Sequence, residues 1–115
     1  MITHPNDVPA AFEAAFNARD IEALLALYAD EALLISDGTA EVPRSGVRAV
    51  LLGFLALPGP ISMSLKRTVM ADDTAVVVAK WELPNGMCGT TTDVVRRGAD
   101  GGWRYVIDAP FGIKS

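Results

Sequence analysis

Tyr28-Ala29-Asp30-Glu31-Ala32 is followed by the dipeptide Asp37-Gly38 and then by Pro43-Arg44-Ser45-Gly46. Residues 32–36 are too few and too apolar for a helix, and Asp-Gly is a common turn sequence, so the stretch predicts a buried strand that enters a turn. Ser45 is a suitable N-cap for a helix after that turn. The segment therefore places one carboxylate, Asp37, between an apolar strand and the start of a helix.

Two helices are expected before this strand. From Val8 to Arg19 the apolar residues recur at steps of three and four, which is the period of a helix with one apolar face. Asp20 is placed to cap a short second helix, and a third is expected from Gly46 to about Leu57, where Pro58-Gly59-Pro60 ends it. One side of the second helix would carry Ile21, Leu24, Leu25 and Tyr28.

After residue 60 the apolar period changes to two, which is typical of strands with one buried face. Turns are expected at Asp72-Asp73, at Pro84-Asn85-Gly86 and at residues 98–102, so four strands form an antiparallel meander. Helices first and strands last predict an α+β domain with the helices on one face of a curved sheet. The other face suits pairing with a second copy of the chain, a homodimer, because it would carry Val76, Val78, Thr92 and Val94.

Composition limits the classes of function. A chain of 115 residues has room for one domain, residues 1–115 with a core of about 8–112. Its net charge of −4 argues against nucleic-acid binding, and it has no apolar run of the roughly 20 residues that cross a membrane. The start of the chain does not resemble a secretory signal, so we expect a cytoplasmic location. With one cysteine, Cys88, and one histidine, His4, neither a zinc site nor another metal or cofactor is expected.

The order helix, helix, strand, helix, meander resembles that of the nuclear transport factor 2-like superfamily, including the ketosteroid isomerases and the uncharacterised SnoaL-like branch. The resemblance extends from about Val8 to Gly112. It rests on Ala18-Arg19-Asp20-Ile21-Glu22-Ala23, on the Tyr28–Ala32 segment and on the tail from Asp93 through Trp103-Arg104-Tyr105-Val106-Ile107-Asp108. It implies a cystatin-like cone in which three helices and a curved antiparallel sheet enclose a pocket.

The resemblance also implies site residues. In ketosteroid isomerases an aspartate after the first strand moves a proton, while a tyrosine and a second, protonated aspartate hold the enolate oxygen. Counting from the two flanking segments puts either Asp37 or Ser36 at the first position, and Asp93 at the second. Phe12 occupies the tyrosine position and has no hydroxyl to donate. SnoaL-type polyketide cyclases, which use one aspartate at the Asp93 position as acid and base, are the closer analogue.

Each acid has a structural alternative. A carboxyl group enclosed by apolar walls resists ionising, so it can take and give a proton near neutral pH, which suits Asp93. Asp93 could instead pair with Arg104 or with Thr91, and Asp37 could simply serve its turn. The family pattern turns Asp108 toward the pocket, where it would contact the ligand, although the residues themselves favour an ion pair with Arg104.

Two hypotheses follow. In the first, the chain binds a small apolar carbonyl compound and moves a proton on it without a cofactor, with Asp93 as acid and base and Asp37 as helper. Phe12, Phe54 and Trp81 would shape the pocket. In the second, the chain is a non-catalytic dimeric module that binds an apolar ligand or partner, and its acids serve turns and ion pairs.

Overall fold

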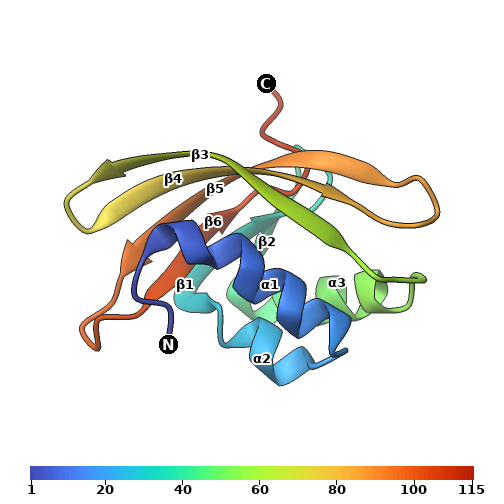
Figure 1. Ribbon diagram of the computed structural model, residues 1–115, viewed down its shortest axis with the longest axis horizontal. Coiled ribbons are helices and arrows are strands. Elements are labelled where there is room, and N and C mark those ends of the chain that lie inside the picture. Colours follow the sequence, from blue (N-terminus) through green and yellow to red (C-terminus); the bar gives the residue numbers. More distant parts are fainter.

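The computed structural model describes all 115 residues and has the predicted α+β architecture. Three helices cover one face of a curved sheet (Figure 1). None of the helices has the length and hydropathy that a membrane crossing requires. After a short 3-10 turn at Pro5–Asp7, the elements are α1 (Val8–Asn17), α2 (Ile21–Leu25), β1 (Tyr28–Ile35), β2 (Glu41–Pro43), α3 (Arg44–Leu55), β3 (Ser62–Ala71), β4 (Thr74–Glu82), β5 (Cys88–Arg97) and β6 (Trp103–Asp108).

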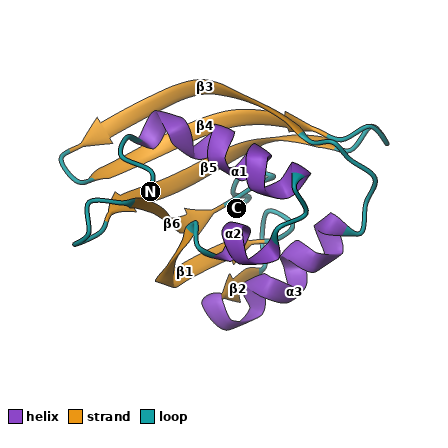
Figure 2. Ribbon diagram, turned by 60° about the horizontal axis from the view of Figure 1, so that its bottom comes forward, coloured by secondary structure: helices purple, strands orange, loops and turns teal.

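The six strands form one sheet in the order β2-β1-β6-β5-β4-β3. Strands β3 to β6 make the predicted antiparallel meander. The sheet is mixed rather than wholly antiparallel, because β1 pairs in parallel with β6 (Figure 2). This pairing joins the first strand to the last and sets Tyr28 opposite Tyr105.

The first two helices are shorter than predicted. Helix α1 ends at Asn17 rather than Arg19, because Arg19 adopts a left-handed backbone conformation with φ of 56°. Asp20 caps α2 as predicted, since its carboxylate accepts a 3.0 Å hydrogen bond from a backbone N–H in the first turn. The placement of Tyr28 on the second helix was wrong: Tyr28 begins β1, where pairing with β6 satisfies the backbone.

The prediction around the first strand also needs correction. Strand β1 begins at Tyr28, four residues before the predicted start, and the three-residue strand β2 was not predicted at all. Pro43, not Ser45, occupies the N-cap position of α3, and this helix ends at Leu55 rather than Leu57. A strand as short as β2 has no periodicity to detect, and it exists because β1 provides it with a partner.

The core lies between the helices and the inner face of the sheet. On β4 the buried residues Ala75, Val77, Ala79 and Trp81 alternate with residues that face outward, as the period of two predicted. Helix α1 lies over β3, and α3 lies over β1. Between these two helices the inner face of the sheet borders the space described next.

Candidate functional site

A small cavity lies between the helices and the inner face of the sheet. Its space for the centres of water-sized molecules is about 40 Å³. That is room for roughly three waters, at about 10–15 Å³ each. Nine of its thirteen lining residues are hydrophobic. The lining consists of Phe12, Phe16, Leu34, Leu51, Phe54, Ile61, Met63, Trp81, Thr91, Asp93, Tyr105, Asp108 and Pro110.

Two buried carboxyl groups on this wall form a pair. Asp93 on β5 is 2% exposed and Asp108 at the end of β6 is 6% exposed. A hydrogen bond joins the carboxyl groups of Asp93 and Asp108 when one of them carries a proton. The hydroxyl of Tyr28 donates a 2.5 Å hydrogen bond to Oδ2 of Asp108. No basic side chain takes part, so this carboxyl pair is hydrogen-bonded without being neutralised by a cation.

The other oxygen of Asp93 is held by β5 and by the residue after β6. The hydroxyl of Thr91 and the backbone N–H of Ala109 both donate to Oδ1 of Asp93, the latter over 3.0 Å. Of the two alternatives considered for Asp93, the contact with Thr91 is therefore present and the ion pair with Arg104 is absent.

A β-bulge in β6 turns Asp108 inward. Val94 and Val95 are neighbours on β5, yet their partners on β6 are Ile107 and Tyr105, so β6 contains one extra residue here. Tyr105 and Asp108 consequently both face the cavity, although a regular strand would turn them to opposite faces. The expected ion pair of Asp108 with Arg104 is wrong, because Arg104 instead contacts Asp100 at 2.6 Å.

Burial determines how the carboxyl pair titrates. Burial, followed by the charge of Asp108 and the hydrogen bond to it, raises the pKa of Asp93 well above its usual range, and the hydrogen bonds from Thr91 and Ala109 offset only part of this. Burial also raises the pKa of Asp108, against the lowering effect of the hydrogen bonds from Asp93 and Tyr28. The pair as a whole therefore retains a proton to higher pH than an ordinary aspartate does, because burial acts on both of its members.

The structure does not bring Asp37 to this pair. Asp37 is exposed in the turn between β1 and β2, where its Oδ1 accepts hydrogen bonds from the backbone N–H groups of Thr39 and Ala40 and from the Thr39 hydroxyl. These bonds lower the pKa of Asp37 to about 2. Neither Asp37 nor Ser36 lines the cavity. The carboxylate of Asp37 therefore stabilises the turn and takes no part in the cavity.

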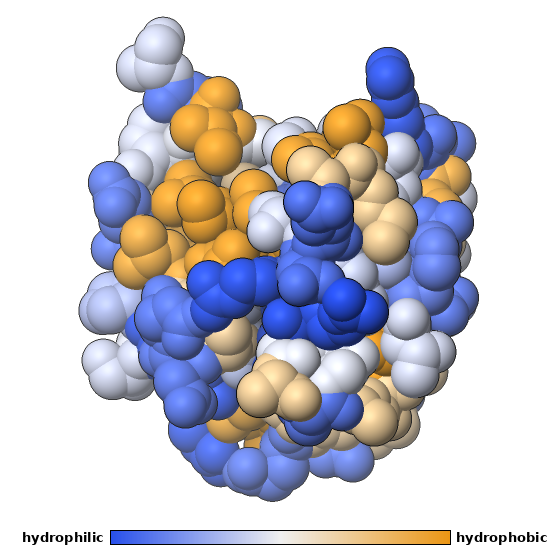
Figure 3. All heavy atoms as spheres, turned by 90° about the vertical axis from the view of Figure 1, so that its left-hand side faces the viewer, coloured by the Kyte–Doolittle hydropathy of each residue, from blue (hydrophilic) through white to orange (hydrophobic).

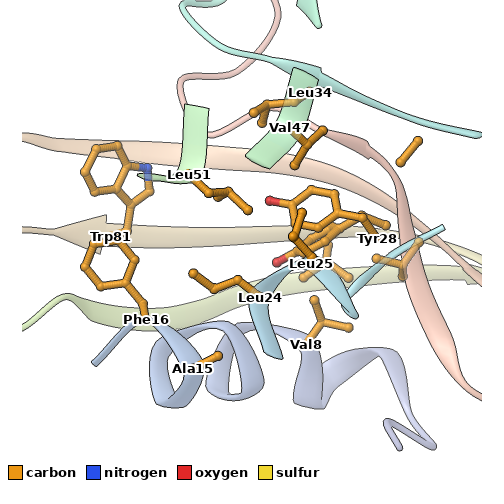
Figure 4. Packing of buried hydrophobic residues seen from close by; sticks show 14 of the residues in the cluster. Val8, Ala15, Phe16, Leu24, Leu25, Tyr28, Leu34, Val47, Leu51 and Trp81 are labelled. Carbon is orange, nitrogen blue, oxygen red and sulfur yellow. The ribbon is translucent and has the colours of Figure 1, made fainter. Parts of the chain in front are cut away.

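The three predicted aromatic residues all border the cavity. Phe54 packs edge-on against Trp81, with ring centroids 6.3 Å apart. The indole N–H of Trp81 donates a 2.7 Å hydrogen bond to the carbonyl oxygen of Pro110. Gly89 lies opposite Trp81 on β5, where an added Cβ would approach both of these atoms to within 3 Å. In Figure 4, Phe16, Leu51 and Trp81 border a space toward which side-chain hydroxyl oxygens point.

Sequence reasoning missed two polar residues of the site, Tyr28 and Tyr105, whereas it had named Thr91 as a possible hydrogen-bonding partner of Asp93. Thr91 and Asp93 lie two apart on one strand, which was a readable signal for a shared face. Tyr28 was assigned to the wrong element, and Tyr105 could be interpreted only as a core residue. Nowhere are three or more His, Cys, Asp or Glu side chains arranged to hold a metal ion.

Comparisons with known proteins agree with this fold. The family model described as SnoaL-like domain matches residues 9–106. A ketosteroid isomerase-like protein from Erwinia carotovora atroseptica has a solved structure with 23% identity and a TM-score of 0.67, covering 89% of this chain and 88% of that one. No curated protein sequence matches significantly.

Two further solved structures share the fold. One, from Thiobacillus denitrificans, is provisionally assigned as a calcium/calmodulin-dependent protein kinase type II association domain; it is 25% identical with a TM-score of 0.79, and the match covers 96% of this chain and 98% of that one. The other, a domain of unknown function with a cystatin-like fold from Nostoc punctiforme, is 14% identical with a TM-score of 0.73, covering 96% of this chain and 75% of that one. The fold resemblance inferred from the sequence is confirmed.

Proposed function

The chain belongs to the SnoaL-like domain family, and from this premise we propose that it binds a small, largely apolar carbonyl compound in the cavity and moves a proton on it without a cofactor. The observation that carries the proposal is the buried Asp93–Asp108 carboxyl pair on the wall of an otherwise apolar cavity. The structural similarity to a ketosteroid isomerase-like protein is consistent with this chemistry but does not by itself assign it.

The carboxyl pair supplies both an acid and a base. With one proton shared between them, the charged carboxylate removes a proton from the carbon next to the carbonyl group. The C–H bond breaks, its electron pair moves toward the carbonyl oxygen, and the proton is carried by the pair. Return of a proton to the same carbon, or to another carbon of the conjugated system, regenerates the carbonyl compound or an isomer.

The environment of the pair favours this transfer. A raised carboxyl pKa brings the base closer to the pH at which it works, and such proton transfer is worth about 10²- to 10⁴-fold in rate. The hydrogen bonds from Tyr28, Thr91 and Ala109 fix the orientation of the two carboxyl groups. The helper role first assigned to Asp37 passes to Asp108 in this proposal, because Asp108 contacts Asp93 directly.

Proton exchange tests the proposal without knowledge of the natural substrate. Cyclopentanone in D₂O exchanges its α-protons slowly, and ¹H NMR follows the loss of their signal. We expect the wild-type protein to accelerate this exchange above the buffer rate, and Asp93→Asn and Asp108→Asn each to lose most of the acceleration. Asp72→Asn is the matched control, since Asp72 is an exposed turn residue with φ of 52°, a conformation that asparagine tolerates. Equal exchange in all four proteins would refute an acid–base role for the pair.

A second candidate function is a non-catalytic dimeric module, in which two copies of this chain pair through the outer face of the sheet, the face turned away from the helices. Val76, Val78 and Val94 are half-buried there, and Val69 on β3 is 51% exposed. Figure 3 shows hydrophobic residues gathered toward the sheet side of the molecule, above a band of hydrophilic residues. Apolar groups on a sheet face that is not covered by helices favour burial against another copy.

A further inference from the structure

Tyr105 carries the one polar side-chain group on the cavity wall that has no partner in the protein. The indole N–H of Trp81 is bonded to Pro110, and the hydroxyl of Thr91 is bonded to Asp93. Asp93 and Asp108 are bonded to each other and to the donors described above. The hydroxyl of Tyr105 makes no hydrogen bond to any protein atom, although Tyr105 is only 2% exposed.

The oxygen of Tyr105 is open to the cavity rather than enclosed by protein. The fully enclosed side-chain polar atoms that lack a partner are Nε of Arg44 and Oγ1 of Thr68, and Oη of Tyr105 is not among them. A hydroxyl withdrawn from bulk water without a hydrogen-bond partner is costly. The hydroxyl of Tyr105 therefore requires an acceptor inside the cavity.

Aromatic contacts fix the position of this hydroxyl. The ring of Tyr105 packs at a centroid distance of 4.9 Å from the ring of Tyr28 and meets the ring of Phe12 edge-on at 6.5 Å. Backbone pairing with Val95 and Tyr28 holds the residue on both sides. The group is thus pre-positioned, which reduces the entropy lost when a ligand binds to it.

We propose that Oη of Tyr105 donates a hydrogen bond to an oxygen atom of the ligand, and that this contact restricts the site to neutral compounds with an acceptor oxygen beside the carbon that faces Asp93 and Asp108. This inference rests on the proposed function and specifies its substrate class. Among such compounds, ketones, aldehydes and esters have the required carbonyl oxygen.

The charges around the site support the restriction to neutral ligands. No arginine, lysine or histidine lines the cavity, so nothing there compensates the negative charge that the carboxyl pair carries once it is ionised. A carboxylate or phosphate ligand would be repelled by that charge and would also lose its hydration. Burial and the charges of Asp93 and Asp108 raise the pKa of Tyr105 well above its usual range, so its hydroxyl stays protonated and acts as a donor.

Two ligands of the same shape separate the hydrogen bond from hydrophobic binding. Cyclopentanone and methylenecyclopentane differ in that an oxygen replaces a CH₂ group, and NMR titration of protein amide signals gives both dissociation constants. We expect Tyr105→Phe to bind cyclopentanone about two- to tenfold more weakly than wild type, which is the effect of one neutral hydrogen bond. Binding of methylenecyclopentane should not change. The α-proton exchange should slow by on the order of a hundredfold, since the same hydroxyl would stabilise the developing enolate oxygen.

The outcomes distinguish this inference from the proposed function. Equal affinity of wild type and Tyr105→Phe for cyclopentanone, with exchange still dependent on Asp93, would overturn the inference and leave the proposed function standing. Tyr105-dependent binding of the ketone without accelerated exchange in the wild type would refute the proposed function alone. Equal weakening of both ligands would also contradict the inference, because the hydroxyl acts only on the oxygen.

A second measurement needs no variant. The carbonyl stretching frequency of cyclopentanone bound to the wild-type protein reports directly on hydrogen-bond donation to its oxygen. The Tyr105→Phe variant is expected to fold, because it removes an atom that has no partner in the protein. A stretching frequency below that in an apolar solvent supports a hydrogen bond from the cavity wall. An unshifted frequency would overturn the inference.

Discussion

The buried carboxyl pair should give the protein an unusual dependence of stability on pH, which Asp93→Asn should reduce. The pKa of Asp93 is raised in the folded protein, whereas in the unfolded chain it is near 3.9. Between these two values the folded state binds more protons than the unfolded state. The free energy of unfolding therefore falls as pH rises from about 4 through the folded-state pKa. The stabilising contribution of Asp93 is fully present only below the pKa that Asp93 has in the unfolded chain.

The size of this effect follows from the number of protons. One extra proton bound by the folded state changes the free energy of unfolding by about 1.4 kcal/mol per pH unit. Asparagine has nearly the shape of a protonated aspartate: its oxygen can accept from Thr91 and Ala109, and its amide can donate to Asp108. Asp93→Asn should therefore lose the contribution of Asp93 to the slope and gain stability relative to wild type with each pH unit above about 4.

The pKa of Asp108 is also raised, so Asp108 adds to the slope with the same sign and remains in the Asp93→Asn variant. The exposed perturbed acids do not interfere with this measurement. The pKa of Asp37 is lowered to about 2, and hydrogen bonds from Arg104 and Gly102 lower the pKa of Asp100 further still. Groups with a lowered folded-state pKa stabilise the fold above the unfolded-state value and lose this contribution as pH falls through the folded-state pKa. Their effect has the opposite sign and lies below about pH 4.

Urea unfolding followed by circular dichroism between pH 4.5 and 8 measures the slope. Wild type, Asp93→Asn and the control Asp72→Asn are compared at constant ionic strength. The control should keep the wild-type slope, because Asp72 is exposed and lies in the β3–β4 turn. Parallel curves for wild type and Asp93→Asn would show that Asp93 is not a desolvated acid, and the reasoning from burial would fail.

Two further predictions concern the partner of Asp108 and the outer face of the sheet. Tyr28→Phe should lower the free energy of unfolding at neutral pH by about 1.5–3 kcal/mol, because it removes a hydrogen bond to a buried carboxyl group; chemical denaturation checks this, and an unchanged stability would mean that the bond is not formed. If the chain is a homodimer through the outer face, Val78→Lys should convert it to a monomer in sedimentation velocity while far-ultraviolet circular dichroism stays the same. A wild-type monomer at 100 μM, roughly a hundred times a micromolar dissociation constant, would contradict the dimer.

Much of the fold could be predicted because its periodicity is local. The alternation along β4 and the spacing of apolar residues along α1 each identify an element without reference to the rest of the chain. The parallel pairing of β1 with β6 could not be read in this way, because it joins residues nearly 80 positions apart. Tyr28 shows the consequence: its spacing fits the helix before it, but a partner strand decides its conformation.

Part of the site could also be predicted from local periodicity. Asp93 lies on a regular stretch of β5, so counting by two places it beside Thr91 on the inner face. Counting fails on β6, where the bulge between Tyr105 and Ile107 reverses the faces and separates Asp108 from Arg104. No single sequence reveals a bulge that lacks a glycine or another turn residue.

Phe12 has no hydroxyl to donate at the position where the ketosteroid isomerases have a tyrosine, and in this fold Tyr105 can supply one. The ring of Tyr105 meets the ring of Phe12 edge-on, so a donor can enter the same part of the cavity from a strand instead of a helix. The cavity wall would then carry one donor as well as a pair of carboxyl groups, which matches a ligand with an acceptor oxygen beside an acidic carbon.

The second hypothesis, in which the acids serve only turns and ion pairs, accounts for Asp37 and Asp100 but not for Asp93 and Asp108. Asp37 caps a turn and Asp100 contacts Arg104, and both arrangements keep an exposed carboxylate in its charged form. The two carboxyl groups on the cavity wall are buried without a cation, which makes the folded state less stable at neutral pH than uncharged residues of similar size would. This loss of stability is confined to one place, beside a cavity and an unpartnered hydroxyl. Residues that lower stability where a ligand could bind are expected at a functional site.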